Sequence, residues 1–397
     1  MIMSESYLKS KILTSGVSFS HRALEYAIRC NAKGQNLVYN APACLEGYRP
    51  QELKLIHSDG YETVVSSVSP CTDEPVFINI EGNELIAIVE GKKVKDVRVE
   101  YIIEPEYYSI KLANQHIAKE YVSACGYDEL NILPWRGCAI SKCCLFCGTN
   151  TVEKMNNSNA LTAFNVSRQN AWEKSRAEYL NSLREAIRIA KKSECYKEHM
   201  HVIIISGDLC DDRLDDQAKI YSEIARAIKE DVVEATEGIV AVMMPPQNPQ
   251  LLSELYISGI HKIVFNLEVG DERLFHKYCP GKANIGYKHI INSLYEAVTV
   301  FGKNNVWTNF VLGLEPTDKL LKLNEDLAKR GIVSSANVLH IDKGNRLDCS
   351  VPDYDTVIHY FYEQANILRK YDQKPFYCSK ALRTSLSNEA YDGRIII

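Results

Sequence analysis

Short apolar runs alternate with longer stretches of helical periodicity from about residue 128 onward. Buried strands joined by amphipathic helices are typical of a parallel sheet covered by its connections. The predicted strands are residues 130–134, 201–206, 238–244, 262–268, 306–312 and 336–341. The predicted helices are residues 171–192, 217–229, 250–258, 287–300 and 318–329. Six strands connected in this way predict a partial (β/α)6 barrel, an α/β fold, with right-handed crossovers.

The first hundred residues show a different pattern, in which short β-type runs are separated by turn signals such as Ser58-Asp59-Gly60 and Glu81-Gly82-Asn83. This pattern predicts a small antiparallel β-rich domain. Its predicted strands are residues 52–57, 62–67, 76–80, 84–89 and 94–99, after a helix at 21–33. A second helix, predicted at 107–124, leads into the barrel.

The expected organisation is therefore an N-terminal α+β accessory domain (1–105), the barrel (106–345) and a C-terminal helical segment and tail (346–397). A helix is predicted at 354–370, and the apolar end of the chain, residues 395–397, is expected to dock on the body. The N-terminal domain and the C-terminal tail are the segments expected to close the cavity of the barrel.

Composition narrows the class of protein. Of 397 residues, 46% are hydrophobic and 24% charged, which is ordinary globular usage. A net charge of -5 lacks the basic excess of a nucleic-acid binder, so no such partner is expected. No apolar run approaches the roughly 20 residues of a membrane-spanning helix, and residues 1–20 do not resemble a signal peptide. These features predict a cytoplasmic enzyme.

Cysteine usage directs attention to one loop. The count is thirteen, an odd number without a secretory signal, which argues against a disulfide framework. Four cysteines fall within ten residues, directly after the first predicted barrel strand, where parallel α/β folds bind ligands: Cys138, Cys143, Cys144 and Cys147. The others occur singly and are expected to be small buried hydrophobic residues: Cys30, Cys44, Cys71, Cys125, Cys195, Cys210, Cys279, Cys349 and Cys378.

Three thiolates can hold three irons of a cubane cluster and leave the fourth iron open, whereas four well-spaced thiolates suit zinc or an electron-transfer cluster. Cys143 and Cys144 are adjacent, so their side chains diverge. The expected metal ligands are Cys138, Cys144 and Cys147, with the spacing C-x5-C-x2-C. A triad with Cys143 in place of Cys144 remains open, as does a structural zinc site.

With aromatic Phe146 directly before the last cysteine, this loop resembles the cluster loop of the radical S-adenosylmethionine (SAM) superfamily. The common family pattern is C-x3-C-x-aromatic-C, and this chain has two more residues in the first gap. The triad containing Cys143 would misplace the aromatic residue. The resemblance implies a [4Fe-4S] cluster and SAM as cofactors.

Three further segments resemble the family in the expected order. Ser206-Gly207-Asp208 stands where the family's GGE motif holds the amino group of SAM. Asn266 and Glu268 lie at the end of the fourth predicted strand, where a polar residue of the family holds the ribose or amino-acid part of SAM. Asn309 and Glu315 match in part the family's region beside the adenine of SAM. Glu315 could equally be an acidic residue that stabilises the N-terminus of a helix.

Several single residues near these segments have more than one possible role. His340 is a further pocket candidate near the end of the sixth strand. Lys277 and Lys282 are expected to be solvated, although either could meet a carboxylate. A strand that ends in Ser-Gly-Asp could also be a plain turn.

The resemblance implies reductive cleavage of SAM to a 5′-deoxyadenosyl radical, with flavodoxin or ferredoxin as electron donor. No cysteine-rich C-terminal extension is present, which favours a small-molecule substrate over a peptide. The variant spacing leaves open the transfer of a methyl or aminocarboxypropyl group. Two alternatives from other classes are a zinc-stabilised, non-catalytic binding protein and a cluster-bearing electron carrier.

Overall fold

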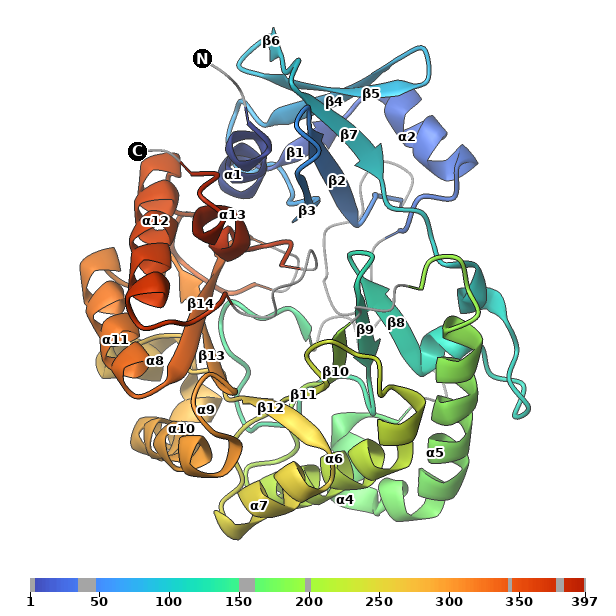
Figure 1. The fold of residues 1–397 in the computed structure, drawn as a ribbon, viewed down its shortest axis with the longest axis vertical. Helices are drawn as coiled ribbons and strands as arrows, with labels where there is room; N and C mark the ends of the chain where they lie inside the picture. Colours follow the sequence, from blue (N-terminus) through green and yellow to red (C-terminus); the bar gives the residue numbers. More distant parts are fainter. Residues whose placement is uncertain are drawn as a thin grey trace.

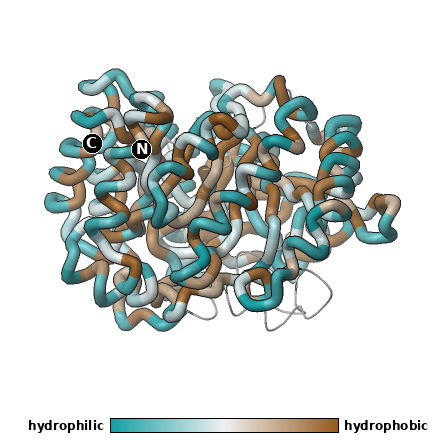
Figure 2. Tube along the Cα trace, turned by 90° about the horizontal axis from the view of Figure 1, so that it is seen from below, coloured by the Kyte–Doolittle hydropathy of each residue, from teal (hydrophilic) through white to brown (hydrophobic). Residues whose placement is uncertain are grey.

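The computed structural model describes residues 4–34, 48–149, 161–196, 201–341, 345–375 and 382–395. Within these ranges the chain forms two sheets, one from the N-terminal region and one from the main body (Figure 1). Hydrophilic positions alternate with apolar ones along the outer helices (Figure 2), as expected of helices with one buried face. No helix in the described ranges has both the length and the apolar character needed to span a membrane.

The sheet of the main body has the order β14-β13-β12-β11-β10-β9-β8. All neighbours from β9 to β14 pair in parallel, and β8 pairs antiparallel with β9. The six predicted barrel strands are therefore present, in chain order. The strands are β8 (Val122–Cys125), β9 (Glu129–Ile132), β10 (His201–Ile205), β11 (Ile239–Val242), β12 (Ile260–Val264), β13 (Val306–Leu312) and β14 (Ile332–Val338).

Helices connect these strands as the periodicity predicts, and they lie on the outer side of the sheet (Figure 1). Both faces of the strands are apolar: Val202 and Ile204 pack toward the main core, whereas Ile203 packs in a smaller cluster with Val240 and Trp307. Burial on two faces is typical of parallel strands. The helices are α4 (Ala163–Gln169), α5 (Ala171–Ala190), α6 (Leu214–Ile228), α7 (Gln250–Ile257), α8 (Glu272–Tyr278), α9 (Pro280–Ile285), α10 (Tyr287–Phe301), α11 (Thr317–Lys329), α12 (Tyr354–Lys370) and α13 (Ser387–Tyr391).

The N-terminal sheet has the order β1-β4-β5-β7-β2-β3, with β6 paired to β5. It is antiparallel, as predicted, except that β1 pairs in parallel with β4. Helix α1 and strand β1 were not predicted. The elements are α1 (Glu5–Ser15), β1 (Val17–Phe19), α2 (His21–Arg29), β2 (Glu52–His57), β3 (Glu62–Ser66), β4 (Val76–Glu81), β5 (Glu84–Val89), β6 (Lys92–Lys93) and β7 (Val97–Tyr101).

The helix predicted at 107–124 is wrong. Two short 3-10 turns, Glu106–Ser109 and Ala118–Glu120, and strand β8 occupy this stretch. Between the turns the side chain of Asn114 accepts a hydrogen bond from the backbone N–H of His116 at 3.1 Å. A local side-chain acceptor of this kind competes with helical hydrogen bonds and favours a turn.

Buried ion pairs join the C-terminal segment to the N-terminal sheet. Glu52 on β2 accepts hydrogen bonds from Lys33 and, at 2.7 Å, from Arg383. Burial alone would raise the pKa of Glu52, but these two cations hold it below its usual value. Lys9 on α1 pairs with Glu389 on α13 at 2.7 Å. The apolar chain end docks as predicted at Ile395, which is buried, and residues 396–397 lie outside the described ranges.

Candidate active site

A cavity of about 570 Å³ lies at the carboxyl ends of the parallel strands. The loop after β9 contributes all four clustered cysteines to its lining, together with Phe146. The segments that follow β10 and β12 contribute Ser206, Gly207, Asp208, Asn266 and Glu268. Residues of the N-terminal region, including Lys33 and Gln51, contribute to the wall, so both parts of the chain line the cavity.

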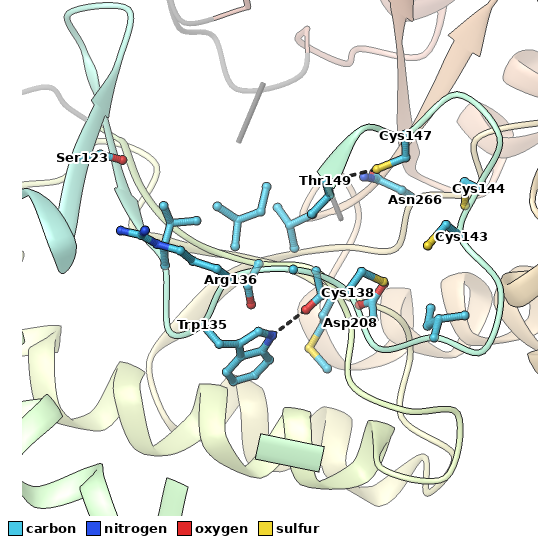
Figure 3. Close-up of a pocket in the computed structure, with 18 of the residues that line it drawn as sticks. Ser123, Trp135, Arg136, Cys138, Cys143, Cys144, Cys147, Thr149, Asp208 and Asn266 are labelled. Atoms are coloured by element: carbon cyan, nitrogen blue, oxygen red, sulfur yellow. Dashed lines mark hydrogen bonds between the residues drawn. The ribbon is translucent and has the colours of Figure 1, made fainter. Parts of the chain in front are cut away.

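Hydrogen bonds from both sides hold the cysteine loop, defined here as residues 136–149. The backbone N–H of Ala139 donates to the carbonyl of Asp208 at 2.7 Å, and that of Leu145 donates to the carbonyl of Tyr278 at 2.8 Å. Arg346 donates its backbone N–H to the Leu145 carbonyl at 2.7 Å and its guanidinium to the Cys143 carbonyl at 2.9 Å. The loop is therefore held by its backbone, and its four cysteines line the cavity (Figure 3).

Two glycines allow the backbone to pass close to this loop. A Cβ at Gly207 would collide with the carbonyl oxygen of Gly137 and lie 2.7 Å from Cα of Cys138. A Cβ at Gly281 would collide with the carbonyl oxygen of Lys142. The backbone at Gly207 and at Gly281 therefore passes close to the protein's own cysteine loop.

Alanine at position 207 is expected to displace the cysteine loop and to destabilise the chain by about 1–3 kcal/mol, the usual cost of overpacking. The clash is with backbone atoms, which cannot rotate away. The urea unfolding midpoint measures this loss. Gly34→Ala is the matched control, since its Cβ would meet only the Tyr48 ring at 3.4 Å. Equal midpoints for the two variants would contradict the assigned close packing.

The environment of the thiols disfavours their ionised form. Burial, followed by the charge of Asp208, raises the pKa of Cys138. A hydrogen bond with the Cys279 thiol, reinforced by burial, raises the pKa of Cys144. Burial also raises the pKa of Cys147, against a hydrogen bond from Thr149 that lowers it. Because thiolates are the metal ligands, metal binding here would release protons and be stronger at higher pH.

The cysteine thiols suit an iron–sulfur cluster in their chemical type and in their number, and they line one cavity. However, no three His, Cys, Asp or Glu side chains lie close enough to hold a metal ion in the part of the chain that the structure describes. Ligation by Cys138, Cys144 and Cys147 therefore requires a rearrangement of this loop from the conformation described.

A buried lysine corrects one sequence-based expectation. Lys282 is not solvated: its side chain is 9% exposed and donates to Glu268 at 2.8 Å and to the Asn266 carbonyl at 3.0 Å. Burial alone would lower the pKa of Lys282, but the neighbouring carboxylates and thiols, Glu268 foremost, raise it. Asn266 keeps a buried Oδ1 without a hydrogen-bond partner among the described residues. This end of the cavity therefore holds a fixed cation and an unused acceptor.

The residues that follow strand β10 have a structural role and also line the cavity. The Asp208 carboxylate accepts from the backbone N–H of Met244 at 2.9 Å and from Gln217 at 3.2 Å, and burial raises its pKa. The hydroxyl of Ser206 lies 2.9 Å from that of Tyr221. Trp135 donates its indole N–H to the Gly207 carbonyl at 2.6 Å (Figure 3). The turn therefore supports the cysteine loop as well as lining the cavity.

Asn309, Glu315 and His340 are not among the described residues that line the cavity. The Glu315 carboxylate accepts the backbone N–H groups of Gly270 and Asp271 at 2.5 and 2.9 Å. Glu315 therefore fixes the loop after β12, because main-chain donors satisfy both of its oxygens. Its pKa is raised by burial and lowered by these two hydrogen bonds.

Sequence reasoning missed several residues beside the cavity. Cys279 was expected to be an incidental buried cysteine, and it is buried, but its thiol contacts that of Cys144. Arg136, Ser123 and Gln51 line the cavity and belong to no motif. Of the other single cysteines, Cys125 is buried, and Cys44 and Cys378 lie outside the described residues. The remainder are only partly buried: Cys30, Cys71, Cys195, Cys210 and Cys349.

No protein-family model and no curated protein matches the sequence. Among solved structures, the FeFe-hydrogenase maturase HydG from Carboxydothermus hydrogenoformans aligns at 13% identity and a TM-score of 0.40, over 65% of this chain and 56% of that one. A further HydG structure aligns at 13% identity and a TM-score of 0.41, over 68% and 58%. Methylornithine synthase (PylB) aligns at 14% identity and a TM-score of 0.40, over 65% and 66%. The chain thus spans less than two thirds of each protein, and similarity this low establishes neither a shared fold nor a shared activity.

Proposed function

We propose that this chain is a radical SAM enzyme in which Cys138, Cys144 and Cys147 hold a [4Fe-4S] cluster. The observation that carries the proposal is the shared position of these thiols on one loop, in one cavity, at the carboxyl edge of six parallel strands. Ligands of parallel α/β proteins bind at this edge. Three thiolates leave one iron of such a cluster open to a further ligand.

When bound and reduced, the cluster would supply the electron that cleaves the carbon–sulfur bond of SAM. The chain's own groups would bind and orient SAM: the carboxylates of Asp208 and Glu268 favour its ammonium, and the unused Oδ1 of Asn266 can accept from it. Phe146 offers an apolar surface beside them. The wall from the N-terminal region, which includes Lys33 and Gln51, would exclude water from the reaction.

The proposed reaction forms a 5′-deoxyadenosyl radical that acts on a small-molecule substrate, with flavodoxin or ferredoxin as electron donor. A cavity of about 570 Å³ is in the range of small-molecule sites, which supports a substrate of that size. The alternative of methyl or aminocarboxypropyl transfer from SAM uses the same donor set and differs in the bond that breaks.

The decisive experiment is anaerobic reconstitution with iron and sulfide, reduction with dithionite, addition of SAM and mass spectrometry of the products. Formation of 5′-deoxyadenosine supports the proposal, and methylthioadenosine indicates aminocarboxypropyl transfer. Stoichiometric zinc without an iron–sulfur cluster would refute the proposal in favour of a zinc-stabilised binding protein. A fully assembled cluster that leaves SAM intact with and without candidate substrates would indicate an electron carrier.

Glu268→Gln is expected to weaken SAM binding by about tenfold while the cluster still assembles, because one charged partner of the ligand is lost. Glutamine retains an acceptor for Lys282, so the hydrogen bond can persist although the charge pairing is lost. SAM titration by calorimetry, with iron content measured in parallel, tests this. Glu315→Gln serves as the control, since Glu315 does not line the cavity. Equal SAM affinity in the wild type and Glu268→Gln would reject the role of Glu268.

A further inference from the structure

Arg136 extends into the cavity away from the cysteines and toward β8, the strand that carries Ser123 (Figure 3). Its backbone is fixed, since its N–H donates to the Leu161 carbonyl at 2.9 Å and its carbonyl accepts from Ala163 at 2.8 Å. Across the described ranges the guanidinium has no hydrogen-bond acceptor and no ion-pair partner. A partly buried guanidinium without a hydrogen-bonded counter-ion is unfavourable, so this position favours an anionic ligand.

Two more polar side chains in the same cavity lack a partner. Ser123 is 5% exposed and Gln51 is 6% exposed, and both line the cavity. Neither the Ser123 Oγ nor the Gln51 Nε2 has a hydrogen-bond partner among the described residues. A buried polar group left unsatisfied costs about 1–3 kcal/mol, and native structures seldom retain one without a role. Both groups can donate, which again suits an oxygen anion.

The charges around these residues indicate a ligand group with one negative charge. Lys33 is committed to Glu52, and Lys119 pairs with Glu104 at 3.2 Å. Glu120 also lines the cavity, and its carboxylate lies 2.7 Å from His116. Arg136 has no direct ion pair among the described residues, and Glu120 is the carboxylate whose charge acts on it. A planar guanidinium matches a carboxylate in a two-pronged hydrogen bond.

Burial acts on the same guanidinium. It lowers the pKa of Arg136, and the nearby Glu120 opposes that shift. Arginine nevertheless remains protonated in proteins, so the positive charge persists. A desolvated charge gains more from a bound anion than a solvated one does.

We propose that Arg136, with Ser123 and Gln51 as hydrogen-bond donors, anchors the carboxylate of the small-molecule substrate. This carboxylate anchor comprises those three residues. Its description as a substrate site rests on the proposed function, whereas its ability to bind a carboxylate does not. In Figure 3 Arg136 points away from Cys143, Cys144 and Cys147, which separates the anchor from the end of the cavity assigned to SAM.

The test measures binding of hexanoate, hexanamide and hexyl phosphate to the reconstituted full chain by isothermal titration calorimetry. Hexanoate is expected to bind, and hexanamide to bind at least about tenfold more weakly. Arg136→Gln should lose at least about tenfold in hexanoate affinity, and Ser123→Ala less. Equal binding of hexanoate and hexanamide by the wild type would overturn the inference. Tighter binding of hexyl phosphate than of hexanoate would overturn the choice of a carboxylate.

Two further readouts keep the outcomes separate. Arg136→Gln should keep wild-type iron content and SAM affinity; weakened SAM binding would assign Arg136 to the SAM site and overturn the inference. If Arg136→Gln fails to fold, Ser123→Ala and the hexanoate–hexanamide comparison still decide. Hexanoate binding without cluster assembly would refute the proposed function and still support the carboxylate anchor. SAM cleavage without selective hexanoate binding would refute the carboxylate anchor and leave the proposed function supported.

Discussion

Alanine at position 144 is expected to reduce the iron bound after reconstitution to background, whereas alanine at position 143 should leave it near the wild-type level. Both thiols line the cavity, so their position alone does not separate them. Cys144 contacts Cys279 and interacts with Cys147, another expected ligand. Cys143 is instead held through its carbonyl by Arg346. Loss of one of three thiolates leaves too few ligands for a stable cluster.

Iron and sulfide per chain, together with visible absorption, measure this difference. Cys210→Ala is the matched control, because Cys210 is also partly buried but does not line the cavity. Cys279→Ala adds information, since it removes the neighbour of Cys144 without removing an expected ligand. The reverse result, with iron lost in Cys143→Ala and kept in Cys144→Ala, would assign the ligand set to Cys138, Cys143 and Cys147.

Elements that local pattern determines were predicted closely. Strands β2, β5 and β13 and helix α12 begin and end at the predicted residues, because each has a strong hydrophobic period bounded by turn residues or a cap. The capping of α12 by Asp353, which accepts from the N–H of Thr356 at 2.8 Å, is a signal readable in sequence. The stretch 107–124 failed because a turn at Asn114 interrupts an otherwise apolar-rich pattern.

The candidate site was predictable only where strand ends converge. The segments after β9, β10 and β12 meet because parallel strands share a carboxyl edge, which brings the cysteine loop to Asp208 and Glu268. The pairing of Lys282 with Glu268 depends on how α9 folds back against the cysteine loop, which no local pattern specifies. The role of Glu315 in fixing the loop after β12 was equally unpredictable, because its partners are backbone groups, which carry no sequence signal.

The second large effect that we expect is a loss of stability when the Lys282–Glu268 ion pair is broken. Lys282→Met is expected to lower the free energy of unfolding by about 3–5 kcal/mol, since removing one partner leaves a carboxylate buried without its counter-ion. Both side chains are largely buried, 9% and 14% exposed, and methionine nearly matches the shape of lysine. The fluorescence-monitored urea midpoint of the metal-free chain measures the loss.

A matched pair of variants isolates the cause of that loss. Lys277→Met removes an exposed lysine from the neighbouring helix α8 and should shift the midpoint little, because solvent screens such a charge. The double variant Glu268→Gln with Lys282→Met should recover part of the lost stability, because the uncompensated charge is gone. If Lys282→Met were as stable as Lys277→Met, Lys282 would be solvated, as the sequence alone had suggested. The cation beside Cys144 would then have no part in organising the cavity.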